Sequence, residues 1–466
     1  MSLRRDNRQN QEGDERAVGA YYEAFVIAVV ICMSPVKAMA YVAPFLSGGW
    51  FLLKSKNRLG RWRTLRIGIL IIAFVSFYWL VSPRFNITGG VLAIVTYSTF
   101  VFLSVVPLKS VANHKLLNRM SDLVGKVLFF EALVGIVQAF ANAFRGGGFD
   151  LANGDAVQGT IHLSLDSDAS FSNPIYAANL VFFLFALIPS FVSKKRSSYL
   201  PLCMGAIAFV LASVLHMILF AIAALGISLV IVRPPLPLKL SRLRLVCTAA
   251  IVPVLALAAL PGNLQTLRYQ VGLFVAGDLP KAASVYRAVY EMPHDYPEMP
   301  VFGLGPGQYS SRAALISTGY YFGGFEDPKS LPFLTPQITA PLSDYLWDLW
   351  VAASDVETYG GSSSAKPFFS WISVYTEFGL PAFVLVFIFS FFLVKRINAR
   401  AKSVEQKWKA VAACSGILFF LLLGFQENYW EVPQAVLVGL MWIQVAYANV
   451  VCEPTSSRAK ELKVST

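Results

Sequence analysis

The chain has 466 residues, of which 56% are hydrophobic and only 14% are charged. A water-soluble protein of this length would expose far more charge, so the composition excludes an ordinary soluble enzyme. The formal net charge of +12 comes mainly from lysines and arginines in short loops between apolar runs. Such loops are typical of a chain that faces an anionic membrane surface, and they give no indication of nucleic-acid binding.

Long apolar runs dominate the chain. Runs of about 17–25 residues match the ~30 Å hydrocarbon core of a bilayer at about 1.5 Å per helical residue. The sequence therefore predicts an all-α, polytopic integral membrane protein with about twelve transmembrane helices. The predicted spans are 20–35, 38–53, 66–82, 89–107, 122–143, 174–193, 199–214, 216–232, 245–261, 368–394, 411–425 and 432–450. The predicted organisation is an N-terminal tail (1–19), nine spans (20–262), one large loop (263–366), three further spans (367–450) and a C-terminal tail (451–466).

The positive charges indicate the orientation of the predicted helices. The apolar stretch 199–231 is too long for one helix and lies between two clusters of lysines and arginines. Because these residues favour cytoplasmic loops, the stretch must cross the membrane an even number of times. The same reasoning, with a break at Ser34-Pro35, divides 20–53 into two spans. Both tails are then cytoplasmic, and the loop 263–366 lies on the outer face.

The N-terminal region allows a second interpretation. Ala38-Met39-Ala40 follows an apolar run and is similar to a signal-peptide cleavage site. Four acidic residues among the first fifteen and a long polar lead favour retention instead. We therefore expect the first span to stay in the protein.

Polar residues in and between the earlier spans are the next candidates for function. Glu131 and His216 lie within spans, where an ionisable side chain is costly and commonly functional, although His216 also suits the outer end of a hairpin. The segment that begins at Arg145 is rich in glycine and aspartate, which is typical of a turn-rich, solvated connector. It ends at Asn173-Pro174, a pattern that predicts a helix start with asparagine as the cap.

The large loop begins with a helical pattern over 264–292, which predicts two helices near the membrane surface. Three glycines follow within five residues, at Gly303, Gly305 and Gly307. Glycines at this density let backbone N–H groups approach a ligand closely, and the alternative is an ordinary tight turn. The segment after them mixes aromatic with polar residues, which suits either stacking on sugar faces or a belt at the membrane interface. These aromatic residues are Tyr320, Tyr321, Trp347, Trp350 and Tyr359.

Arg287 is the residue of this loop that we most expect to bind a substrate. Its planar fork of donors suits the oxygens of a phosphate or diphosphate. Glu291, His294 and Asp295 follow it closely and could supply a general base. The alternative is a solvated, mixed-charge helix end. His294 is the only histidine of the loop sequence, so we expect no metal there, and we expect no cofactor.

Three short motifs resemble a known family. The segment from Arg287 to Tyr309 resembles the outer-loop signature of the bacterial O-antigen polymerase and O-antigen ligase superfamily. The segment 371–381, which contains Glu377, resembles the helix that follows this loop. The aromatic-x-Asn-Pro element at Asn173 resembles the entry to a middle span. Twelve spans with one large outer loop before the last three also match this superfamily.

The resemblance implies a GT-C-like membrane glycosyltransferase of the bacterial inner membrane that uses no nucleotide sugar. A glycan linked to polyprenyl diphosphate would donate its reducing end to an acceptor hydroxyl on another lipid-linked glycan. Membrane lipid, a chain-length regulator and a flippase are the other expected partners. The implied catalytic residues are Arg287, His294 and Glu291. The implied substrate-binding residues are Arg145, Arg312, Gly303, Gly305, Gly307, Tyr309, Asn173 and Glu377.

Two departures from the family pattern bear on the reaction. Ligases of the family usually carry a histidine about nine residues before the glutamate of the post-loop helix, and this chain has Phe368 there. A Ser-Arg-Gly-like element at an outer hairpin is replaced by 213–217, which leaves Arg287, Arg145 and Arg312 as the cationic candidates. The first departure favours a polymerase of O-antigen, capsule or exopolysaccharide over a ligase.

A transporter of lipid-linked glycans is the alternative from another class. A transporter would show charged or broken helices at the membrane midplane, together with inverted repeats. The predicted spans are mostly apolar and the polar residues are concentrated in one outer loop, so the sequence favours an enzyme.

Overall fold

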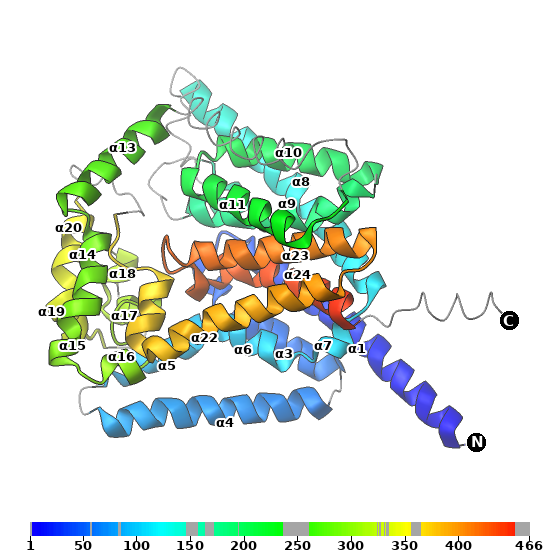
Figure 1. Cartoon of the computed structure of the whole chain (residues 1–466), viewed down its shortest axis with the longest axis horizontal. Helices are drawn as coiled ribbons and strands as arrows, with labels where there is room; N and C mark the ends of the chain where they lie inside the picture. Colours follow the sequence, from blue (N-terminus) through cyan, green and yellow to red (C-terminus); the bar gives the residue numbers. More distant parts are fainter. Residues whose placement is uncertain are drawn as a thin grey trace.

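The computed structural model describes residues 2–55, 58–82, 85–145, 157–163, 172–193, 195–235, 261–323, 325, 328–329, 331, 335–355 and 365–452. Every regular element within these residues is a helix, which confirms the all-α prediction for this part of the chain (Figure 1). Long apolar helices lie side by side, and shorter helices gather at one end of them.

Seven of the described helices are long and apolar enough to cross a membrane. Each coincides with a predicted span, which is consistent with a multi-pass membrane protein. They are α4 (Arg58–Val81), α8 (His114–Arg145), α9 (Ser172–Val192), α11 (Leu215–Val232), α22 (Ser370–Arg400), α23 (Val404–Leu423) and α24 (Pro433–Cys452).

Two of the predicted spans are broken. The span 89–107 consists of α5 (Ile87–Thr96) and α6 (Ser98–Val105), which meet at an angle of 52°. Tyr97 between them has non-helical backbone angles, with φ −90° and ψ 6°. α22 changes direction at Gly379, whose φ of 79° lies in the left-handed region that glycine tolerates.

The remaining predicted spans are shorter or only partly described. The first, 20–35, overlaps the end of α1 (Ser2–Cys32), and two others are helices of 13 residues, α3 (Ala43–Ser55) and α10 (Tyr199–Leu211). Thirteen residues are too few to cross a bilayer as one straight helix. The segment 245–260 lies outside the described residues. The total of twelve spans therefore stays a prediction.

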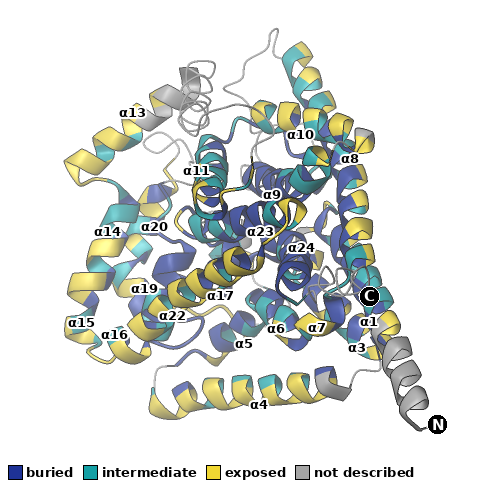
Figure 2. Ribbon diagram, turned by 45° about the vertical axis from the view of Figure 1, so that its right-hand side comes forward, coloured by how far each residue is buried: buried dark blue, intermediate teal, exposed yellow. Residues whose placement is uncertain are grey.

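Burial divides the long helices into an inner and an outer set (Figure 2). α9, α23 and α24 are largely buried, whereas α4 is exposed along most of its length. Glycines bring the inner helices together, because a Cβ at Gly439 of α24 would lie 2.4 Å from the Phe182 ring of α9. A Cβ at Gly416 of α23 would likewise lie 2.5 Å from Ile443. Close approach of this kind stabilises helix pairs where lipid is as apolar as the side chains.

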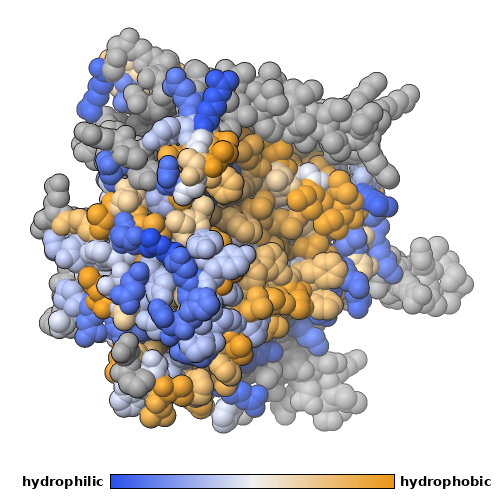
Figure 3. All heavy atoms as spheres, turned by 60° about the vertical axis from the view of Figure 1, so that its left-hand side comes forward, coloured by the Kyte–Doolittle hydropathy of each residue, from blue (hydrophilic) through white to orange (hydrophobic). Residues whose placement is uncertain are grey.

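The start of α1 and the end of α24 lie at the same end of the long helices. Figure 1 shows both there, and the short helices of the large loop at the other end. Hydrophobic residues gather over the long helices and hydrophilic residues over the short ones (Figure 3). The division between apolar and polar surface therefore follows the division between long and short helices.

The large loop is itself mostly helical in its described part. Its elements are α13 (Pro261–Ala276), α14 (Pro280–Tyr286), the π-helical turn η4 (Arg287–Glu291), α15 (Met292–Asp295), α16 (Met299–Phe302), α17 (Arg312–Ser317), α18 (Tyr320–Gly323), α19 (Ala340–Tyr345) and α20 (Trp347–Ala353). α13 and α14 correspond to the two helices predicted over 264–292. The other short elements are α2 (Lys37–Ala40), α7 (Leu108–Val111), η2 (Gly159–Ile161), η3 (Arg196–Ser198) and η5 (Tyr429–Glu431).

Aromatic side chains form a core inside the large loop. The rings of Trp347 and Trp350 meet edge to face with their centres 5.6 Å apart, and Trp350 meets Phe368 in the same way at 5.8 Å. Tyr320 packs against Trp347 at 5.0 Å. Trp350 is 6% exposed, so it stabilises the loop itself rather than offering a face to a sugar or to lipid. Tyr359 lies outside the described residues.

Candidate functional site

The three glycines of the loop form a turn (the glycine turn, 303–309) that packs against the start of α22. The buried carboxylate of Glu377 accepts three backbone hydrogen bonds from this region. The donors are the N–H groups of Gly307 at 2.6 Å, Tyr309 at 2.9 Å and Ser311 at 3.1 Å. Hydrogen bonds to a carboxylate are stronger than those to a neutral acceptor. Glu377 therefore fixes the turn on α22, and these three N–H groups are occupied within the protein.

Backbone packing explains why glycine recurs in the turn. Gly303, Gly305 and Gly307 have φ values of 76°, 97° and 75°, a region that other residues rarely adopt. A Cβ at Gly307 would lie 2.1 Å from the carbonyl oxygen of Gly89, and one at Gly303 would lie 2.3 Å from that of Glu377. The turn is therefore wedged between α5 and α22. That the glycine turn also contacts a substrate stays a prediction.

Arg287 is bound to a carboxylate. Its Nη1 and Nη2 donate to the two side-chain oxygens of Asp348 at 2.6 and 2.8 Å, and Nη1 also donates to the carbonyl of Tyr345 at 3.2 Å. This hydrogen bonding raises the pKa of Arg287 and lowers the pKa of Asp348. The sequence suggested that Arg287 is either a phosphate ligand or a solvated helix end. Neither interpretation included this pair. A diphosphate at Arg287 would have to compete with Asp348.

The predicted general bases lie on the surface of the loop. Glu291 and His294 are exposed, at the end of η4 and in α15. Asp295 is also exposed and accepts a hydrogen bond from the hydroxyl of Tyr345. This contact raises the pKa of Tyr345 to about 12. These residues form a rim near Arg287, and their role as a base stays a prediction.

Two further predicted residues lie apart from the loop. The side-chain amide of Asn173 donates to the carbonyls of Val157 at 2.7 Å and Ala212 at 3.1 Å, so it joins α9 to two neighbouring segments. Arg145 is the exposed last residue of α8. No described contact brings either residue to Arg312 or Arg287.

Arg312 is the most deeply buried arginine among the described residues. It is 2% exposed, and its guanidinium lies 3.5 Å from Glu427 and 4.9 Å from the centre of the Tyr321 ring. Its backbone N–H donates to Glu431 at 2.5 Å, and its side chain also pairs with the hydroxyl of Tyr41. A buried guanidinium needs such partners, because an unpaired buried charge is strongly destabilising.

The connection between α23 and α24 (the acidic hairpin, 424–432) supplies these carboxylates. Glu427 and Glu431 are both 0% exposed. Burial raises the pKa of Glu431 to about 8, with Glu377 adding to the rise and Arg312 opposing it. The Oε2 atom of Glu427 is buried and has no hydrogen-bond partner among the described residues. A buried acceptor without a partner points to a missing donor.

Two lysines complete a group that we call the charged cluster: Arg312, Glu427, Glu431, Lys281 and Lys366. Lys366 lies 3.8 Å from Glu427, and Lys281 donates to the carbonyl of Gln426. Only Arg312 of this group was among the predicted site residues. Glu427 and Glu431 did leave a signal in the sequence, because they are the only charged residues from 410 to 452. They lie in the short connector between the predicted spans 411–425 and 432–450.

A long apolar cavity of about 710 Å³ adjoins the charged cluster. Its lining includes Tyr97 and Trp430, and the Tyr97 side chain contacts that of Glu431. Along α22 the lining extends from Val374 to Leu393, on both sides of the bend at Gly379. The straight part after the bend, from Ala382 to Leu393, contributes roughly 15 Å at about 1.5 Å per residue.

The described residues contain no group of three or more His, Cys, Asp or Glu side chains that could hold a metal ion. Comparison with known protein families, with curated proteins and with solved structures finds no match for this chain.

Proposed function

We propose that the chain is a membrane glycosyltransferase that polymerises polyprenyl-diphosphate-linked oligosaccharide repeat units. In this proposal it crosses the bacterial inner membrane twelve times and keeps both termini in the cytoplasm. The loop 263–366 then lies on the outer face, where donor and acceptor glycans meet. A flippase and a chain-length regulator are the expected protein partners.

One observation carries the proposal: a buried charged cluster lies beside Tyr97, a residue that lines an apolar cavity. A lipid-linked diphosphate has the same two parts, an anionic head and a long hydrocarbon chain. Arg312, Lys281 and Lys366 supply three cations at the head end. The apolar cavity beside Tyr97 and Trp430 suits the hydrocarbon chain of the lipid.

The proposed reaction uses Glu427 as the base. One of its oxygens is held by Arg312 and Lys366, and the other has no hydrogen-bond partner among the described residues. The acceptor hydroxyl would give its proton to this second oxygen while its own oxygen bonds to the donor's anomeric carbon. The bond from that carbon to the diphosphate oxygen breaks, and the diphosphate leaves with the electron pair. The cations of the cluster stabilise the charge that develops there.

In this proposal Arg312, rather than Arg287, stabilises the leaving diphosphate. Arg312 lies in a buried setting, where electrostatic stabilisation is stronger than in water. Arg287 lies at the rim and is already paired with Asp348, so it suits a contact with the glycan or with an incoming diphosphate.

Reconstitution tests the proposal directly. The purified chain in liposomes would receive lipid-linked repeat units, and the products would be separated by length. We expect a ladder of chains that remain attached to polyprenyl diphosphate. Transfer of single units only to a different lipid acceptor would support the ligase alternative, and a failure of any glycosidic bond to form would refute both.

A transporter of lipid-linked glycans remains the second candidate because two predicted spans are broken. α5 and α6 meet at 52°, and α22 bends at Gly379. Broken helices commonly line transport sites. The same liposomes separate the two functions, because a transporter would move intact lipid-linked units across the bilayer and leave their length unchanged.

A further inference from the structure

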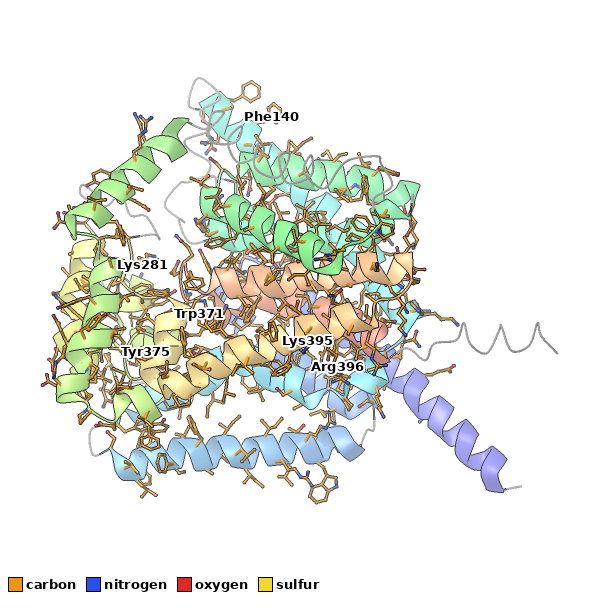
Figure 4. The ribbon with its side chains drawn as sticks, in the orientation of Figure 1. Phe140, Lys281, Trp371, Tyr375, Lys395 and Arg396 are labelled. Carbon is orange, nitrogen blue, oxygen red and sulfur yellow. The ribbon has the colours of Figure 1, made fainter. Side chains whose placement is uncertain are left out.

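Lys281 joins the large loop to the long helices. It lies on α14, and its ammonium group donates to the main-chain carbonyl of Gln426 in the acidic hairpin (Figure 4). The ammonium nitrogen also lies 5.5 Å from the centre of the Phe369 ring, just before α22. The residue keeps part of its surface exposed while its charged end turns inward. Its ammonium group therefore lies at the junction between the large loop and the long helices.

The surroundings of Lys281 carry more positive than negative charge. Lys366 and Arg312 both lie against the single carboxylate of Glu427, at 3.8 and 3.5 Å. Lys281 itself is bonded to a neutral carbonyl, which an anion could replace as the stronger partner. The side chain of Lys366 is 27% exposed, so a second cation of the group faces the same opening. The three cations of the charged cluster outnumber its two carboxylates, Glu427 and Glu431, and this excess of positive charge favours the binding of an anion.

We infer that Lys281 and Lys366, with Arg312 behind them, bind the diphosphate of the lipid-linked substrate, and that Lys281 takes up a proton when this group binds. The inference rests on the proposed function, because the diphosphate is the donor's leaving group. It adds a residue that the sequence motifs do not contain. It also makes substrate binding dependent on pH.

The proton uptake follows from the groups that face Lys281. The pKa of Lys281 is lowered to about 7, mainly by burial; the charge of Glu427 opposes this shift and that of Lys366 adds to it. His216, at the start of α11, lies within electrostatic reach, and its Nε2 has no hydrogen-bond partner among the described residues. On the adjoining α20, Asp348 is held by Arg287.

A bound diphosphate places negative charge beside the ammonium group and raises its pKa. At pH 6, Lys281 is charged with or without the ligand, so binding takes up almost no proton there. At pH 8, the free protein has mostly lost this proton and must regain it on binding. The Kd should therefore rise by about tenfold per pH unit above pH 7.

Calorimetry on the full chain in lipid nanodiscs tests the inference, with farnesyl diphosphate as the probe. Titrations at pH 6, 7 and 8, in buffers of different ionisation enthalpy, give both the Kd and the number of protons taken up. Lys281→Arg keeps a charge that does not titrate in this range, so it should bind at every pH with no uptake beyond the ligand's own. Lys281→Met should weaken binding at pH 6 by about tenfold or more. Lys329→Met, which removes an exposed lysine of the same loop, should behave like the wild type.

Three results would overturn the inference. The first is proton uptake that is equal in the wild type and in Lys281→Arg, since the uptake would then belong to the ligand alone. The second is unchanged affinity in Lys281→Met. The third is no binding by the wild type. Failure of the proposed function is a separate outcome, in which farnesyl diphosphate binds with proton uptake at Lys281 but no glycan chain grows in liposomes.

Discussion

Replacing Glu377 with glutamine should strongly destabilise the protein, although it changes one atom. Three backbone N–H groups, of Gly307, Tyr309 and Ser311, donate to the two carboxylate oxygens. An amide keeps one oxygen and so can keep at most the two bonds made to Oε1. Its NH₂ group then faces the N–H of Gly307, and that buried donor loses its acceptor.

The magnitude follows from these three bonds. A buried donor left without a partner costs about 1–3 kcal/mol, and each bond that changes from a charged to a neutral acceptor loses about 1 kcal/mol. Glu377→Gln should therefore lower the free energy of unfolding by about 3–5 kcal/mol. Glu298→Gln is the matched control, because Glu298 is exposed, and it should change the free energy by less than about 0.5 kcal/mol.

Thermal and denaturant unfolding of both variants in the same detergent measures this difference. The midpoint of Glu377→Gln should fall well below those of the wild type and Glu298→Gln. Equal stability of all three would refute the reasoning, because the glycine turn would then not depend on the carboxylate for its position on α22.

Three further predictions concern the loop. Gly305→Val should lower both the unfolding midpoint and the polymer yield, since a φ of 97° is strained by about 1–3 kcal/mol for valine; a fully stable variant would contradict this. Arg287→Ala should slow polymer growth more than Asp348→Ala does, because only the arginine can contact a diphosphate; equal losses would mean that the pair merely holds η4 to α20. With the native cysteines replaced, Ser354→Cys should react with a membrane-impermeant reagent in intact spheroplasts and Ser403→Cys should not, and the reverse pattern would exclude an outer loop.

The sequence predicted the long helices well because their signal is local. An apolar run longer than about 17 residues has few alternatives to a membrane-spanning helix. The bend at Tyr97 could not be predicted, since neither glycine nor proline marks it and the neighbouring elements determine it. The 13-residue lengths of α3 and α10 likewise depend on where packing ends each helix.

The site was predicted only in part because its contacts are distant in the chain. The glycine pattern revealed the turn, but its carboxylate partner lies about 70 residues away. Arg312 meets Glu427 across a separation of 115 residues, which no periodicity records. The sequence does not predict the pair of Arg287 with Asp348. Asp348 lies in a segment whose sequence is distinguished only by its aromatic residues.

The rate of glycosidic bond formation by Glu427→Gln tests the central claim most directly. The variant keeps the size of the side chain but removes the proposed base, and Glu298→Gln serves as its control in the same liposomes. The rate is measured on protein that is shown to be folded and to bind farnesyl diphosphate, because Glu427 also pairs with the buried Arg312. For that protein the account predicts a loss of about 10²–10⁴ in rate. Polymer growth by Glu427→Gln at the rate of the wild type would contradict the assignment of the charged cluster as the catalytic site.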